Sequence, residues 1–259
     1  MGEGATPPGG GLAVRRAGSG PRVVLVHGFT QSARSWRAIA GELEAAHEVV
    51  TVDLPGHGGS AGCAARDLPE AARLLGEAGG RATYVGYSMG GRICLVLALA
   101  APELVERLVL VGATPGIAEE AERDARRASD EVLADRLEGL GLEGFLDEWL
   151  SGPLFAHLTP EQADRQARRV NTTAGLAAAL RALGTGRQAP CWERLGELAM
   201  PVLAVAGEND AKFVALAERM TRAIGPNARA AVVAGAGHAV AFERPVAFAD
   251  ELRRFLAEP

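Results

Sequence analysis

The chain has 259 residues, of which 48% are hydrophobic and 23% charged, and its formal net charge at pH 7 is -5. This apolar fraction excludes a disordered protein, and three scattered cysteines exclude a disulfide scaffold. The acidic balance argues against nucleic acid as a partner, and the most apolar run, Ile93–Ala101, is too short to span a membrane. Residues 1–20 lack the apolar stretch of a secretory signal. We therefore expect a cytoplasmic protein with reduced cysteines, acting as a monomer or weak homo-oligomer.

Short apolar runs alternate with longer helical patterns along most of the chain. The runs are rich in Val or Leu, whereas the longer segments carry apolar residues at three- and four-residue spacing. The predicted strands are Val23–His27, Val49–Asp53, Ala82–Tyr87, Arg107–Val111, Val202–Ala206 and Ala230–Val233. The predicted helices that alternate with them are Trp36–Glu44, Leu68–Ala78, Gly90–Ala100, Lys212–Ile224 and Pro245–Leu256. This alternation predicts an α/β fold with a mostly parallel sheet covered by helices on both faces.

The strongest local motif follows the third predicted strand, where residues Gly86–Gly91 read G-Y-S-M-G-G before an apolar helix. G-x-S-x-G in a strand–turn–helix setting is typical of a nucleophile elbow, a sharp turn that exposes a reactive serine hydroxyl. Glycines at 86 and 90 allow neighbouring backbone to approach without a Cβ clash. We predict that Ser88 is the reactive residue; the alternative is a tight turn without chemistry.

Strand-like runs disappear between Thr114 and about Glu193. Arg, Glu and Ala dominate there, in helical patterns such as Glu119–Leu140 and Thr159–Leu183. We interpret this stretch as a helical cap inserted into the α/β core, and the alternative is that ordinary helices continue the main fold. The predicted division is a first part of the core over residues 1–113, the cap over 114–193 and a second part of the core over 194–259.

The last two predicted strands are each followed by a residue that could complete a site with Ser88. A serine hydroxyl needs a base, and a histidine base needs an orienting carboxylate. Asp210 follows the strand Val202–Ala206 and His238 follows the final strand, so both fall at the strand ends where open α/β sheets place their sites. Glu208 is the alternative acid, but two further residues carry Asp210 past the turn. For His238 the alternative is an ordinary loop histidine.

Two backbone amides are expected to stabilise negative charge beside Ser88. The N–H of Met89 lies at the start of the predicted helix, where the helix dipole is positive. The N–H of Phe29 belongs to the loop after the first strand, where Gly28 permits a turn. Together they predict an oxyanion hole. The alternative is that His27-Gly28 only terminates the strand.

The sequence shows no pattern for a metal or a nucleotide. The cysteines lack paired spacing, and the histidines lack the i, i+4 arrangement of a helical zinc site. The stretch Gly56–Gly59 is not a dinucleotide fingerprint and has no Walker lysine. We expect neither a metal nor a cofactor.

After its first ~20 residues the chain resembles the α/β-hydrolase superfamily over essentially its full length. Within it, the chain is similar to the 2-succinyl-6-hydroxy-2,4-cyclohexadiene-1-carboxylate synthases of menaquinone biosynthesis. The segments that carry this similarity are Asp53–Gly58, Gly86–Arg92, Trp149 with Pro153–Phe155, Leu180–Gly186, Gly207–Phe213 and Ala236–Val240. The resemblance implies a cofactor-free lyase that eliminates pyruvate from 2-succinyl-5-enolpyruvyl-6-hydroxy-3-cyclohexene-1-carboxylate. It further implies that Ser88 accepts the ring proton, with His238 and Asp210 raising its basicity.

The resemblance also implies a small-molecule substrate with several carboxylates, which arginines would hold. The candidate substrate-binding residues are Tyr87, Arg92, Arg126, Arg127, Trp149 and Arg168. Arg92 begins the helix after the elbow, the other three arginines lie on predicted cap helices, and Trp149 would close the apolar side. Because all but one of the 27 basic residues are arginines, the alternative for each is a solvated surface residue.

Two other functions fit the same residues. A carboxylesterase or a carbon–carbon bond hydrolase would use Ser88, Asp210 and His238 for acyl chemistry. A binding protein on a hydrolase scaffold would use the pocket without catalysis, but a matched serine, aspartate and histidine argue against it.

Overall fold

The computed structural model describes residues 11–258 and is built on a seven-stranded sheet with the strand order β1-β3-β2-β4-β5-β6-β7. Residues 1–10, which include half of the N-terminal stretch considered above, lie outside the described residues, as does Pro259. The strands are β1 Val14–Ala17, β2 Arg22–Val26, β3 Glu48–Val52, β4 Ala82–Tyr87, β5 Val105–Val111, β6 Val202–Gly207 and β7 Ala228–Val233. β1 is antiparallel to β3 and all other pairings are parallel, so the predicted mostly parallel sheet is confirmed.

Burial explains the clearest strand predictions. Every residue of β4 and of β6 is buried, which produces the continuous apolar runs that parallel strands covered on both faces require. The edge strand β1 was not predicted. Its four residues include Arg15 and Arg16, which are exposed, so no apolar run marks it.

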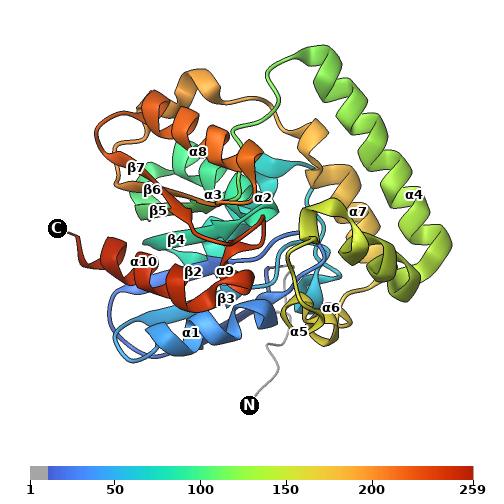
Figure 1. Ribbon diagram of the computed structural model, residues 1–259, viewed down its shortest axis with the longest axis horizontal. Coiled ribbons are helices and arrows are strands. Elements are labelled where there is room, and N and C mark those ends of the chain that lie inside the picture. The colour runs from blue at the N-terminus through green and yellow to red at the C-terminus, as the bar shows by residue number, and fades with distance from the viewer. Residues whose placement is uncertain (1–10, 259) are drawn as a thin grey trace.

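Helices cover both faces of the sheet, with α1 and α10 on one face and α2, α3 and α8 on the other (Figure 1). The α-helices are α1 Arg37–Leu43, α2 Leu68–Gly79, α3 Met89–Ala100, α4 Glu120–Ser151, α5 Pro160–Ala163, α6 Arg165–Arg168, α7 Thr173–Leu183, α8 Ala211–Ile224, α9 Val240–Glu243 and α10 Pro245–Ala257. The 3-10 helices are η1 Ala33–Trp36, η2 Gly58–Ser60, η3 Pro102–Leu104, η4 Pro153–Phe155, η5 Thr185–Arg187 and η6 Trp192–Glu197. Among the described helices, none is both long and apolar enough to cross a bilayer.

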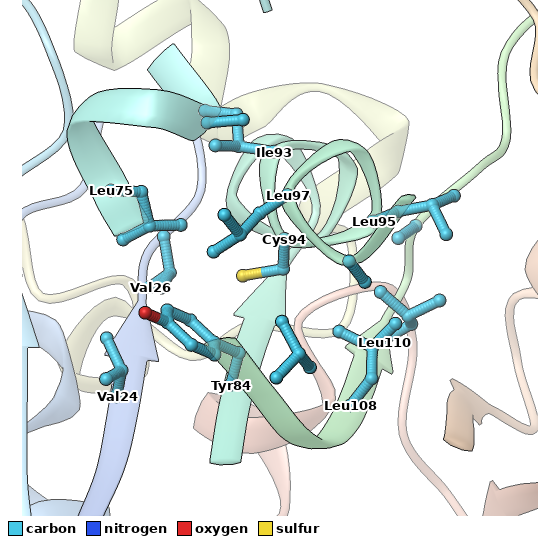
Figure 2. Close-up of a cluster of buried hydrophobic side chains, with 14 of the residues drawn as sticks. Val24, Val26, Leu75, Tyr84, Ile93, Cys94, Leu95, Leu97, Leu108 and Leu110 are labelled. Carbon is cyan, nitrogen blue, oxygen red and sulfur yellow. The ribbon is translucent and has the colours of Figure 1, made fainter. Parts of the chain in front are cut away.

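The larger apolar cluster fixes α3, and with it the turn before α3, on the sheet. Figure 2 shows side chains of α2 and α3 gathered with those of β2, β4 and β5. Ile93, Cys94 and Leu95 of α3 are fully buried there. Burying a large aliphatic side chain contributes about 1.5–3 kcal/mol. The first turn of α3 is therefore held rigidly at the end of β4.

Between β5 and β6 the described chain forms α4 to α7 and no strand, and these helices stand together beside the sheet (Figure 1). We call residues 120–183 the helical segment. It has its own apolar cluster, built from α4 and α7 around Phe145 and Leu176. The pattern predicted over Glu119–Leu140 continues beyond a break at Gly141 to Ser151.

The helical pattern over Thr159–Leu183 is wrong in its continuity, because α5, α6 and α7 divide it. Asp164 adopts a left-handed conformation with φ 44°, which ends α5. Its side chain accepts a hydrogen bond from the amide of Ala167 and so begins α6. Thr172 begins α7 in the same way, through the amide of Gly175. Capping side chains therefore override the apolar spacing here.

Candidate active site

Ser88 lies at the turn between β4 and α3 in a strained backbone conformation, with φ 51° and ψ -111°. A non-glycine residue in such a region costs on the order of 1–3 kcal/mol, and such strain is typical of functional sites. The amide of Ser88 donates to the carbonyl of Val111 at 2.8 Å, which holds the turn against β5. A Cβ at Gly90 would lie 2.5 Å from the carbonyl oxygens of Val26 and His27, so only glycine lets α3 start this close to β2. The turn leaves Ser88 partly exposed.

Three residues from distant parts of the sequence form one hydrogen-bonded chain. Nε2 of His238 lies 3.3 Å from Oγ of Ser88, and Nδ1 lies 2.9 Å from Oδ2 of Asp210. Because an ionised carboxylate only accepts hydrogen bonds, Nδ1 carries the proton and Nε2 presents a lone pair to the serine hydroxyl. The structure thus brings together Ser88, Asp210 and His238, in the arrangement that activates a serine oxygen.

The loops that carry the acid and the histidine are themselves fixed. Oδ1 of Asp210 accepts the amide of Phe213 at 3.3 Å at the start of α8, which leaves Oδ2 for His238. The ring of Phe213 lies 4.5 Å from the imidazole, between centroids, and covers it. Glu208, the alternative acid, instead accepts the amide of Gly235 at 2.9 Å and is exposed. Asp210, and not Glu208, is therefore the carboxylate that contacts His238.

Glu243 supports the histidine loop and was not singled out from the sequence. Its buried carboxylate accepts the amides of Gly237 at 2.5 Å and Ala239 at 2.9 Å, the residues on either side of His238. A carboxylate that accepts two backbone N–H groups gives strong, charge-assisted bonds. The only sequence signal was an acidic residue close after the histidine.

The amides of Phe29 and Met89 are available to a ligand. In the loop after β2, Gly28 N–H donates to Oε1 of Gln31 at 3.1 Å, and the backbone N–H of Gln31 donates to the carbonyl of Gly28 at 3.2 Å. A Cβ at Gly28 would lie 2.8 Å from the ring of Tyr87, so glycine lets this loop approach the residue before Ser88. Within the described residues, neither Phe29 N–H nor Met89 N–H has a protein acceptor. Both amides can therefore serve a developing negative charge.

Arg92 and Arg168 differ from the other arginines of residues 11–258 because they are buried, with 5% and 2% of their surface exposed. Arg92 donates to the carbonyl of Leu183 at 2.7 Å and to Oε1 of Gln188 at 3.4 Å. Arg168 donates to the carbonyl of Ala163 at 2.8 Å and to the hydroxyl of Thr30. Within the described chain, neither guanidinium has a carboxylate within ion-pair distance.

Burial affects the charge of both groups. It lowers the pKa of Arg92 to about 10, and the nearby charge of Arg126 acts in the same direction. Burial likewise lowers the pKa of Arg168 to about 10. Both remain protonated at neutral pH. The charge of Asp130 acts in the opposite direction on Arg92, as does that of Asp164 on Arg168, but neither carboxylate is hydrogen-bonded to the guanidinium, so a bound anion would stabilise each buried cation further.

The other two predicted arginines already have acidic partners. Nε of Arg126 lies 2.8 Å from Asp130, and the side chain is partly exposed. Arg127 pairs with Asp124 at 3.2 Å within the same helix. Of these two arginines, Arg126 is the one whose charge influences the pKa of Arg92. Burial thus separates candidates that the sequence could not rank.

Tyr87 and Trp149 line the site with aromatic rings. The Tyr87 ring lies 5.4 Å from the His238 imidazole, and burial raises the pKa of its phenol well above the usual range. Trp149 of α4 meets Phe29 edge to face at 5.5 Å and stacks on Phe145 at 5.9 Å. The helical segment therefore contacts the loop after β2 directly. The indole N–H of Trp149 is buried without a protein partner in the described structure.

Two further histidines, His27 and His57, lie near Phe29 but are not hydrogen-bonded to Ser88, His238 or Asp210. Burial lowers the pKa of His27 to about 4 and that of His57 to about 3. Nδ1 of each faces a backbone carbonyl, at 2.8 Å for Gly28 and 2.9 Å for Pro55, so each is neutral with the proton on Nδ1. Across residues 11–258, no three or more His, Cys, Asp and Glu side chains gather as a metal site would require.

The fold and this arrangement define the class of protein. Residues 23–251 match the alpha/beta hydrolase family, so the chain belongs to that family and is an enzyme of its superfamily. It is similar to the 2-succinyl-6-hydroxy-2,4-cyclohexadiene-1-carboxylate synthase of Salmonella newport (strain SL254), with 34% identity over 250 residues, 91% of this chain and 94% of that protein.

Two solved structures are similar to this chain over most of its length. A structure of MenH from S. aureus shares 31% identity with a TM-score of 0.87, covering 94% of this chain and 97% of that chain. A thermophilic esterase from Thermogutta terrifontis, with malate bound, shares 25% identity with a TM-score of 0.75, covering 95% of this chain and 92% of that chain.

Proposed function

We propose that the enzyme eliminates pyruvate from 2-succinyl-5-enolpyruvyl-6-hydroxy-3-cyclohexene-1-carboxylate and forms 2-succinyl-6-hydroxy-2,4-cyclohexadiene-1-carboxylate, a step of menaquinone biosynthesis that needs no cofactor. One observation carries the proposal beyond the fold. Arg92 and Arg168, the buried arginines without carboxylate partners, flank the loops that hold Ser88 and Phe29. Cations in this state suit a substrate with several carboxylates.

The Ser88–His238–Asp210 chain supplies the base. Nε2 of His238 takes the hydroxyl proton, and the Ser88 oxygen removes a proton from the ring carbon. The C–H electron pair at C2 forms a C2=C3 bond, the C3=C4 pair shifts to C4=C5, and the C5–O bond to the enolpyruvyl group breaks. The imidazolium, stabilised by Asp210, returns a proton to the departing enolate, which becomes pyruvate. Ser88 regains its own proton from the ring and is never acylated.

The amides of Phe29 and Met89 stabilise the charge that develops on the succinyl carbonyl oxygen, which is conjugated with the ring carbon, during proton removal. Arg92 and Arg168 hold other carboxylates, and Trp149 and Tyr87 provide the apolar walls. Of the two remaining arginines, Arg126 is the better candidate for the substrate, because its charge already reaches Arg92. We assign residues 114–193 as a cap on a core of 1–113 and 194–259, because their helices contact Phe29 through Trp149.

A coupled assay tests the proposal. Purified enzyme is incubated with the enolpyruvyl substrate, and a dehydrogenase follows the release of pyruvate. We expect one pyruvate per substrate consumed, and the Ser88→Ala variant serves as the matched blank. Substrate loss without pyruvate, or no turnover at all, would contradict the proposal.

A carboxylesterase or a carbon–carbon bond hydrolase is the second candidate. The hydrogen-bonded Ser88, His238 and Asp210 also suit acyl transfer, and an esterase shares the fold. p-Nitrophenyl acetate discriminates between the two. Rapid turnover of this neutral ester, combined with no release of pyruvate, would favour the hydrolase. A neutral ester gains nothing from the two buried guanidinium groups, so we expect slow turnover.

A further inference from the structure

The loop that carries the Phe29 amide is strained at its next residue. Thr30 is fully buried and has φ 66°, a left-handed conformation that a β-branched side chain rarely adopts. Such a conformation persists only when the surrounding structure enforces it. The enforcing contacts here come from the helical segment, about 140 residues further along the chain.

Asn171, in the turn between α6 and α7, makes most of these contacts. Its Nδ2 donates to the carbonyls of Thr30 at 2.7 Å, Gln31 at 3.3 Å and Arg168 at 2.9 Å. Its Oδ1 accepts the amide of Gly58 at 2.8 Å. The side chain is 5% exposed, so these bonds form away from water. One amide group thus joins three separate segments of the backbone.

Two neighbouring bonds act on the same loop. Arg168 donates to the hydroxyl of Thr30, and Oγ of Ser32 donates to the carbonyl of Ala167 at 3.1 Å. Residues 167–171 therefore hold residues 30–32 through side chains on both partners. Phe29 belongs to the same loop and immediately precedes the residues that the helical segment holds.

We propose that Asn171 is a positioning residue, which fixes the direction of the Phe29 amide toward the oxyanion at Ser88. The proposal rests on the role given to Phe29 above. It also couples two parts of the site, since Arg168, a substrate-binding residue in our proposal, donates to the same loop. Loss of the Asn171 contacts should reduce transition-state stabilisation more than substrate binding.

The test replaces Asn171 with aspartate, which has nearly the same shape. Asn171→Asp keeps an acceptor for Gly58 N–H but presents oxygen to the carbonyls of Thr30 and Gln31. We expect kcat to fall about 10- to 100-fold, somewhat less than the loss of a whole oxyanion donor, with KM changed by less than about threefold. Because a partly unfolded sample would also lower the apparent kcat at constant KM, circular dichroism measures the folded fraction and kcat is calculated per folded molecule.

Asn227→Asp is the matched control. Nδ2 of Asn227 also bridges two carbonyls, those of Leu198 and Met200, each at 2.7 Å, beside the start of β6. We expect this variant to lose stability and keep its kcat. If Asn171→Asp does not fold, Ser32→Ala decides the matter, because it removes only the bond to Ala167. We expect its kcat to fall about three- to tenfold, since one of several supporting bonds is lost.

Each variant is assayed both for pyruvate release and for hydrolysis of p-nitrophenyl acetate, because the Phe29 amide would serve either reaction. If the wild-type enzyme releases no pyruvate, the proposed function is refuted. The kcat for p-nitrophenyl acetate hydrolysis then still tests the role of Asn171. Wild-type kcat in the folded Asn171→Asp variant, or a change in KM alone, overturns the inference while leaving the proposed function intact.

Discussion

Arginines on the outer surface of the helical segment have different partners from the arginine on its inner side. On the outer surface, Arg181 pairs with Glu131, Asp135 and Glu138 while partly exposed to water. On the inner side, Arg168 is buried and binds only neutral oxygens. The residue type is the same, but only the outer arginine is paired directly with carboxylates of the protein.

The difference indicates where binding energy resides. Exposed ion pairs contribute about 0–1 kcal/mol because water screens them. A buried guanidinium has lost its water and gains much more from a carboxylate. We therefore attribute substrate recognition to Arg92 and Arg168 and regard the surface network as structural.

Removing the base should have the largest effect. Ser88→Ala and His238→Ala each eliminate the proton acceptor, and we expect the elimination rate to fall on the order of 10²- to 10⁴-fold. Single-turnover measurements of pyruvate formation check this. Full activity in Ser88→Ala would show that the base lies elsewhere.

Removing a buried cation should have the next largest effect. Arg92→Ala and Arg168→Ala each abolish a charge-assisted contact, so we expect kcat/KM to fall roughly 100-fold, through a strong rise in KM and a smaller fall in kcat. Steady-state kinetics over a range of substrate concentrations measure both constants. Wild-type kinetics in Arg92→Ala would remove the main support for a polycarboxylate substrate.

Burial also predicts a pH dependence of stability, through the histidines beside Phe29. His57 has a folded pKa of about 3 against an ordinary value of 6.5, so at acidic pH only the unfolded chain binds its proton. Stability present above pH 6.5 is lost as the pH falls, by about 2 kcal/mol between pH 7.5 and 5 for this residue. Urea unfolding should show that His57→Asn loses less stability than the wild type over that interval. Identical losses in the two proteins would be evidence against a neutral, buried His57.

Removing an exposed cation should have the smallest effect. Arg181→Ala breaks three surface ion pairs, yet we expect unchanged kinetics and a loss of at most about 1 kcal/mol in the free energy of unfolding. Parallel kinetics and urea unfolding provide the measurement. A KM increase matching that of Arg168→Ala would erase the distinction between the two surfaces.

The sequence revealed the fold where strands carry apolar runs. Six of the seven strands were predicted in this way, from β4 and β6, which are buried throughout, to β7, which is mostly not buried but rich in Ala and Val. The edge strand β1 escaped because it carries two exposed arginines. The break at Asp164 escaped because a left-handed residue leaves no trace in apolar spacing.

The site was predictable to the extent that chain order and strand ends determine it. Ser88, Asp210 and His238 each follow a strand, so their proximity followed from a parallel sheet. Spacing could not rank Arg92 and Arg168 above Arg126 and Arg127, because burial depends on the packed structure. Contacts between positions far apart in sequence, such as those of Asn171 with Thr30, leave no local pattern either.

A crystal structure of the Ser88→Ala variant with the bound enolpyruvyl substrate tests the central claim most directly. Our account predicts substrate carboxylates within hydrogen-bond distance of the guanidinium groups of Arg92 and Arg168, and the ring proton facing position 88. A substrate bound elsewhere, or one that leaves both guanidinium groups without an anion, would contradict it.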